Sequence, residues 1–200
     1  MLDPLASAAA QELQSSDPLL TTLHDESVAF DAMLGVLKAE VRAENVRLSD
    51  EAKLAWQRGA RAWSDVRDDL QRGHWRDALQ LARLARLSCQ RGADEAFSVR
   101  ASRPVKQAIK AYIDAMDPRL VAVRQRLGAL QDPMLLERWR AAKGRYESAK
   151  QLAAVEQLGS AWTTLLSTAG SLDELVLDVA RMEAAAPVTS RAGAGGGYPR

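Results

Sequence analysis

The sequence predicts an all-α protein, an elongated antiparallel helical bundle or short helical-hairpin array with a flexible C-terminal tail. Its 200 residues include 36 Ala and 27 Leu but only 2 Ile, a composition that favours helices over strands. Apolar side chains recur at spacings of three and four, as at Phe30, Leu34, Leu37 and Val41. Asp-Pro pairs add helix starts, because Asp accepts from free backbone N–H groups and Pro suits the first helical position.

The Asp-Pro pairs place four helix starts, at Asp3-Pro4, Asp17-Pro18, Asp117-Pro118 and Asp132-Pro133. Two serines are further predicted caps, Ser49 before two acidic residues and Ser171 in a capping box with Glu174. Helix ends are expected at Gly73, Gly92 and Gly159, and Pro104 is expected to kink or break the chain.

These signals predict ten helical segments, several of which can run together: 4–14, 18–47, 50–72, 74–91, 93–101, 103–116, 118–131, 133–158, 161–168 and 172–185. We expect residues 1–185 to form a single helical domain, which can divide into sub-units 1–101 and 102–185. Residues 186–200 are expected to be a disordered tail, because this Gly-rich stretch cannot bury enough apolar surface to offset chain entropy.

One pattern occurs twice, 83 residues apart. The heptad series Ala52, Trp56, Gly59, Trp63 and Val66 recurs as Leu135, Trp139, Ala142, Tyr146 and Ala149. Such spacing is typical of coiled-coil packing. Either the chain contains an internal duplication, or two long core helices have similar shapes.

Composition also excludes several classes of protein. One Cys rules out a disulfide framework, and two His with that Cys leave no cluster able to hold a structural zinc. Cys89 is expected to be a buried, inert thiol. No apolar run approaches the length of a membrane span, and the first residues lack the basic region of a signal peptide. We therefore expect a cytoplasmic protein without membrane contact, cofactor or metal.

No catalytic or phosphate-binding motif is recognisable, so we expect the protein not to be an enzyme. An enzyme would require polar groups that converge on a pocket. The prediction is a non-enzymatic interaction protein, an adaptor, scaffold or chaperone-like protein. It would bind a protein partner, or a second copy of itself as a homodimer, through amphipathic helix faces. The candidate docking residues are Leu19, Leu20, Leu23, Phe30, Leu34, Leu37 and Val41.

The alternative is a helical protein that binds nucleic acid through its Arg-rich middle region. Residues 1–41 carry a net charge of −6 and residues 42–150 a net charge of +9, within an overall charge of +1. Acidic residues interleave with these bases, so a salt-bridged surface competes with this interpretation, for example through Asp65 with Arg61. The candidate phosphate-binding residues are Arg58, Arg61, Arg72, Arg76, Arg83 and Arg86.

Overall fold

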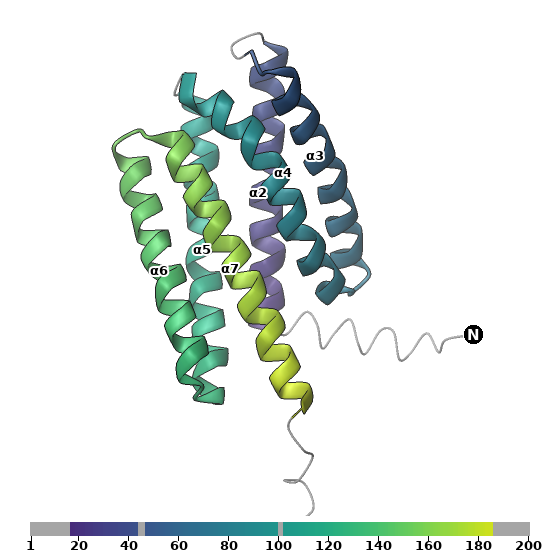
Figure 1. Cartoon of the computed structure of the whole chain (residues 1–200), viewed down its shortest axis with the longest axis vertical. Coiled ribbons are helices and arrows are strands. Elements are labelled where there is room, and N and C mark those ends of the chain that lie inside the picture. The colour runs from purple at the N-terminus through teal and green to yellow at the C-terminus, as the bar shows by residue number, and fades with distance from the viewer. Residues whose placement is uncertain (1–16, 44–46, 100–101, 186–200) are drawn as a thin grey trace, which may run out of the picture.

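The computed structural model describes residues 17–43, 47–99 and 102–185. These residues form helices and no strand, which confirms the all-α prediction. With the labels of Figure 1, the helices are α2 (Pro18–Arg42), α3 (Asp50–Gln71), α4 (Trp75–Val99), α5 (Arg103–Leu130), α6 (Pro133–Ala154) and α7 (Leu158–Ala185).

The helices form a two-layered bundle elongated along their axes (Figure 1). One layer contains α3, α4, α7 and α6 in that order, and α2 and α5 lie side by side behind it. Short connections make α3 antiparallel to α4, and α6 antiparallel to α7. The seam between α4 and α7 therefore runs down the middle of the four-helix layer.

Local sequence signals fix several helix ends as predicted. Asp17 and Asp132 cap α2 and α6, accepting from the backbone N–H groups of the residues two positions later at 2.9 and 2.8 Å. Ser49 caps α3 by accepting from the N–H of Ala52, three positions later, at 3.1 Å. Gly73 ends the α3 region with φ of 79°, a conformation that favours glycine. The N–H groups of Gly73 and His74 then donate to carbonyls of the last turn of α3.

Other predicted boundaries are wrong because tertiary packing continues the helix through them. Pro118 lies inside α5, where its neighbours Met116 and Arg119 are both buried in the bundle. Gly92 lies inside α4, and a Cβ there would be only 2.9 Å from Trp56 Cβ, so this glycine permits close contact with α3. The Ser171 hydroxyl donates to the Ser167 carbonyl within α7 and caps no helix.

The segments predicted on either side of Gly92 therefore merge into α4, those on either side of Pro118 into α5, and those on either side of Ser171 into α7. Gly159 accordingly lies in the first turn of α7. Two predicted ends move inward: α2 stops at Arg42 and α6 at Ala154. The predicted helix 4–14 and the predicted tail 186–200 lie outside the described residues.

The 83-residue pattern is present in the observed helices α3 and α6. α3 and α6 both have 22 residues and start 83 residues apart. Their buried residues also correspond: Ala52, Gly59, Trp63 and Val66 in α3 match Leu135, Ala142, Tyr146 and Ala149 in α6. α2 packs against α5 and α4 against α7, so two helices of 17–99 each contact the helix in the corresponding position of 102–185.

An aromatic cluster joins helices from both halves of the chain at the centre of the core. The Phe30 ring stacks on Trp162 with centroids 5.6 Å apart, and contacts Trp63 at 4.1 Å. Tyr112 lies against Phe30 and Trp162 at 6.1 and 5.4 Å. Aromatic pairs of this kind add roughly 0.5–1.5 kcal/mol each to the burial of their surface. Cluster members from α2, α3, α5 and α7 therefore hold both layers together.

Cys89 is fully buried where α4 meets α3, and burial raises the pKa of its thiol to about 12. Only the thiolate attacks thiol reagents, so the folded protein is expected to react with an aromatic disulfide reagent at pH 8 only when it opens. Absorbance of the released thiol should follow the unfolding rate at high reagent concentration. A reaction as fast as that of a free cysteine would contradict this burial.

Candidate functional site

The bundle encloses a network of four charged side chains, one from each of α2, α4, α5 and α7. Arg86 donates to Glu26 at 2.6 Å and to Asp173. Arg119 donates to Glu26 at 2.8 Å and to Asp173. The Tyr112 hydroxyl also donates to Glu26. All five residues are at most 2% exposed, so this network is shielded from water while its four formal charges cancel.

The two carboxylates of the network differ in their surroundings. Burial alone would raise the pKa of Glu26, but Arg86, Arg119 and the Tyr112 hydroxyl together hold it below its ordinary value. Asp173 has the two guanidinium groups but no hydroxyl donor among the described residues, and burial raises its pKa above the ordinary value. Glu26 is therefore the more firmly ionised of the two.

This difference predicts opposite pH dependences for two neutralising variants. Stability from ionised Glu26 is present above its ordinary pKa of 4.5 and is lost as pH falls through the lower folded value. Ionised Asp173 instead destabilises the folded protein, because its pKa in the folded state is above the ordinary value. This cost is removed as pH falls through the raised pKa toward the ordinary value of 3.8. On acidification the wild type should lose stability relative to Glu26→Gln but gain it relative to Asp173→Asn. Urea unfolding at several pH values measures both stability differences. If the two differences changed with pH in the same direction, the opposite pKa shifts of Glu26 and Asp173 would be refuted.

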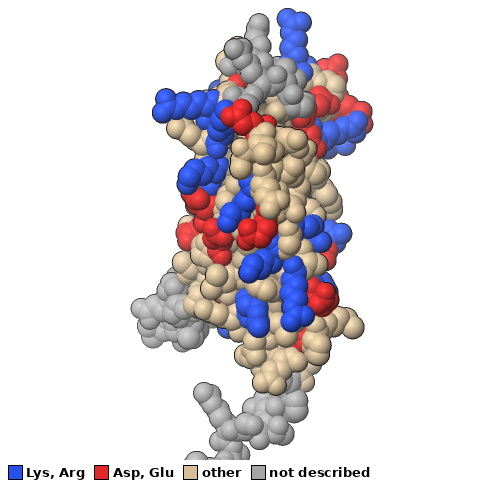
Figure 2. Space-filling model, turned by 90° about the vertical axis from the view of Figure 1, so that its left-hand side faces the viewer, with Lys and Arg blue, Asp and Glu red and all other residues tan. Residues whose placement is uncertain are grey.

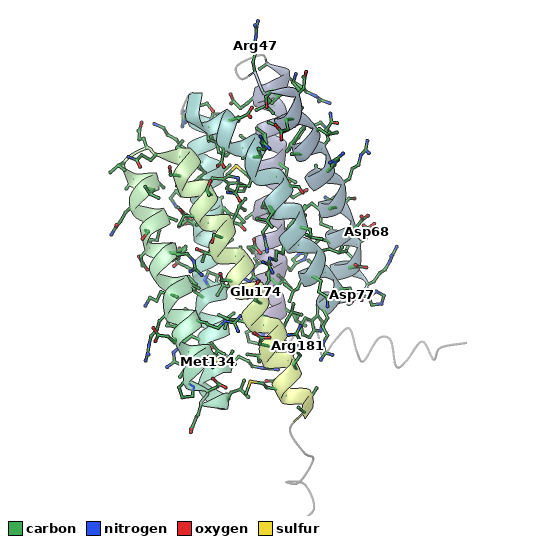
Figure 3. The ribbon with its side chains drawn as sticks, viewed as in Figure 1. Arg47, Asp68, Asp77, Met134, Glu174 and Arg181 are labelled. Carbon is green, nitrogen blue, oxygen red and sulfur yellow. The ribbon has the colours of Figure 1, made fainter. Side chains whose placement is uncertain are left out.

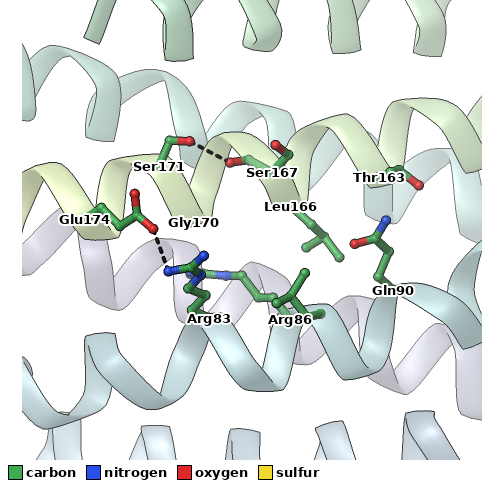
Figure 4. A pocket seen from close by; sticks show the side chains of 10 residues that line it. Arg83, Arg86, Gln90, Thr163, Leu166, Ser167, Gly170, Ser171 and Glu174 are labelled. Carbon is green, nitrogen blue, oxygen red and sulfur yellow. Dashed lines mark hydrogen bonds and ion pairs between the residues drawn. The ribbon is translucent and has the colours of Figure 1, made fainter. Parts of the chain in front are cut away.

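A groove of about 500 Å³, lined by polar and apolar side chains, lies above this network, along the seam between α4 and α7 (Figure 4). Arg86 forms part of its floor, and Arg83 at the rim pairs with Glu174 at 2.7 Å. Leu87 borders it with 57% exposure. The remaining lining residues are polar, small or apolar side chains from both helices: Gln90, Thr163, Leu166, Ser167, Gly170 and Ser171.

Hydroxyl groups of the groove are hydrogen-bonded both to their own helix and to neighbouring helices. Thr163 donates to the Gly159 carbonyl at 3.1 Å and also bonds Asp94, whose pKa is raised by burial. Ser171 accepts from Arg145 at 2.7 Å. The ionisable groups of the charge network converge inside the bundle, which is an arrangement that an enzyme would need. The absence of catalytic activity therefore stays a prediction.

The predicted docking residues lie in the core of the structure. Leu23, Phe30, Leu34 and Leu37 are buried, and Leu19 and Val41 pack against the core. Leu20 is half-buried beside Trp75. A partner could therefore reach this face only if α2 left the bundle.

The predicted phosphate-binding residues separate into two groups. Arg86 is buried in the charge network, whereas the others are exposed: Arg58, Arg61, Arg72, Arg76 and Arg83. Acidic side chains point outward on the same flank, at Asp68 and Asp77 (Figure 3). The α6 side likewise mixes both signs of charge (Figure 2). Nucleic-acid binding stays a prediction, and its signature would be an affinity that falls steeply with salt.

The charge network was not anticipated from the sequence, although a signal for it is present. Glu26 lies three residues after Leu23 and four before Phe30, on the apolar stripe of α2. Arg119 occupies a similar position between Met116 and Val123 in α5. A charged residue within an apolar stripe indicates a buried partner, because an unpaired buried charge is strongly destabilising.

Comparisons with family models, curated proteins and solved structures gave no match for this chain. Among the residues that the structure describes, no group of three or more His, Cys, Asp or Glu side chains could hold a metal ion. Within the same residues, no helix combines the length and apolarity needed to cross a membrane.

Proposed function

We propose that this chain is a non-enzymatic interaction protein that binds a protein partner on the exposed face of the α4–α7 seam. The observation that carries the proposal is the groove in this face, together with apolar side chains of α4 that remain in solvent. Leu84 and Leu87 lie one turn apart on α4 and are 62% and 57% exposed. Exposed apolar residues beside convergent polar groups are typical of binding surfaces.

The charge network supports a binding role for the same face. Its guanidinium and carboxylate groups are paired with one another and hold four helices in one arrangement. Two of those helices, α4 and α7, form the groove walls. A rigid wall lowers the entropy lost on binding, because its side chains are already positioned.

Gly170 offers a variant that fills the groove while leaving the core intact. A Cβ at this position would meet no atom within 4 Å. Gly170→Leu should therefore place an isobutyl group in the groove. The matched control is Gly144→Leu on α6, where a Cβ also meets nothing within 4 Å.

The test is affinity capture from an extract of the cells that make the protein. Wild type and Gly144→Leu are expected to retain the same partner, and Gly170→Leu is expected to retain at least tenfold less. Circular dichroism and thermal unfolding of all three proteins verify that the helices are unchanged. A partner held equally by all three would place the interface elsewhere and refute the proposal.

A further inference from the structure

Arg86, which lines the α4–α7 groove, has a donor whose hydrogen-bonding capacity is unused. The terminal nitrogens of Arg86 are bonded to Glu26 and Asp173, and its guanidinium lies over the Trp63 ring at 5.4 Å. Its Nε–H is buried, and no described residue accepts a hydrogen bond from it. A buried donor without an acceptor is destabilising, so an acceptor that reaches Nε is favoured.

Gly170 leaves the opposite wall of the groove open beside this donor. It lies in α7 across from Arg83 and Arg86 (Figure 4). Because it has no side chain and a Cβ there would be in open space, small groups can enter at this point. The groove volume of about 500 Å³ is within the range of small-ligand pockets, roughly 300–1,000 Å³.

The charges of the groove favour a monoanion. Arg83 is 60% exposed and has donors beyond the one that contacts Glu174. Glu174 is 42% exposed and offsets one positive charge, which disfavours a phosphate dianion more than a carboxylate. A guanidinium matches the planar carboxylate geometrically, and Leu87 and Leu166 can contact the methylene groups that carry it.

We infer that the groove is a carboxylate-binding site, in which Arg83 and the Nε–H of Arg86 hold an acidic side chain of the protein partner. This inference rests on the proposed function and specifies the chemistry of the partner. The side chain enters beside Gly170, and its carboxylate replaces solvent between the rim and the floor of the groove. Ser167 and Gln90 line the same space and can donate to the second oxygen.

The test observes the Nε–H signals of arginine by NMR while a side-chain mimic is added to the full chain. The probe is N-acetyl-glutamate N-methylamide, and the matched control is the glutamine analogue, which has the same shape without the charge. The Arg86 signal is assigned through its proximity to the Trp63 ring. Inorganic phosphate at equal ionic strength forms a third arm.

The expected result is a saturable shift of the Arg86 signal with the glutamate probe. Binding should be at least tenfold weaker with the glutamine probe and in Gly170→Leu, and unchanged in Gly144→Leu. No saturable shift, an equal response to glutamine, or tighter binding of phosphate would overturn the inference. If capture of the partner still depends on Gly170, such a result leaves the proposed function standing. Conversely, probe binding with capture indifferent to Gly170→Leu refutes the proposed function, and with it the assignment of the carboxylate to the partner, while the carboxylate site itself stands.

Discussion

Arg119→Met is expected to lower the free energy of unfolding by about 3–5 kcal/mol. The variant removes one of two guanidinium groups from the network and leaves Glu26 and Asp173 to share Arg86. An excess negative charge would then be buried, because the carboxylates are at most 1% exposed. Urea denaturation monitored by Trp fluorescence measures the loss, since Trp63 and Trp162 lie in the core.

Two comparisons show whether this loss comes from the unpaired charge. Arg126→Met removes an exposed arginine of the same helix, which pairs with Glu183, and should cost no more than about 1 kcal/mol. Replacing Glu26, Arg86, Arg119 and Asp173 together by Leu or Met should cost less than Arg119→Met alone, because no buried charge remains. If the fourfold variant is the less stable of the two, the network contributes net stability and our account of its energetics is wrong.

Gly59→Ala is expected to destabilise the bundle by about 1–3 kcal/mol through overpacking between α3 and α4. A Cβ at this position would lie 2.5 Å from Cys89 Sγ, 2.7 Å from Cys89 N and 2.8 Å from the Ala85 carbonyl oxygen. Two of these atoms belong to the α4 backbone, so the helices must separate. Thermal and urea unfolding measure the effect, and faster modification of Cys89 should accompany it.

Gly144→Ala is the matched control for this variant, because a Cβ at this position of α6 meets nothing within 4 Å. There, the higher helix propensity of Ala should stabilise the protein by up to about 1 kcal/mol. Opposite signs for the two substitutions support close contact at Gly59. Equal stabilisation by both would show that α3 and α4 lie farther apart than described.

Sequence reasoning predicted those features of the fold that depend on neighbouring residues. Asp17 and Asp132 cap helices because an Asp-Pro pair satisfies local backbone donors, whatever the rest of the chain does. Gly73 ends a helix for a similarly local reason. Pro118 and Ser171 gave the same kinds of signal but lie within helices, because burial on both sides favours a continuous helix.

The candidate site was less accessible to sequence reasoning, because its residues come together only through tertiary packing. Arg86 was assigned to a solvent-exposed set because its spacing from Arg83 suggested a shared surface. The structure places one at the rim of the groove and the other at its floor. Only the pairing of α4 with α7 distinguishes them, and no local pattern specifies that pairing.

Site-specific photo-cross-linking tests most directly whether the α4–α7 seam is the binding face. A benzophenone side chain replaces exposed Leu87 in one protein and Met134, at the start of α6 and away from Glu174 (Figure 3), in another. Irradiation in cell extract is expected to join the partner to position 87 and not to position 134. Adducts at 134 alone, or equal adducts at both positions, would contradict the account.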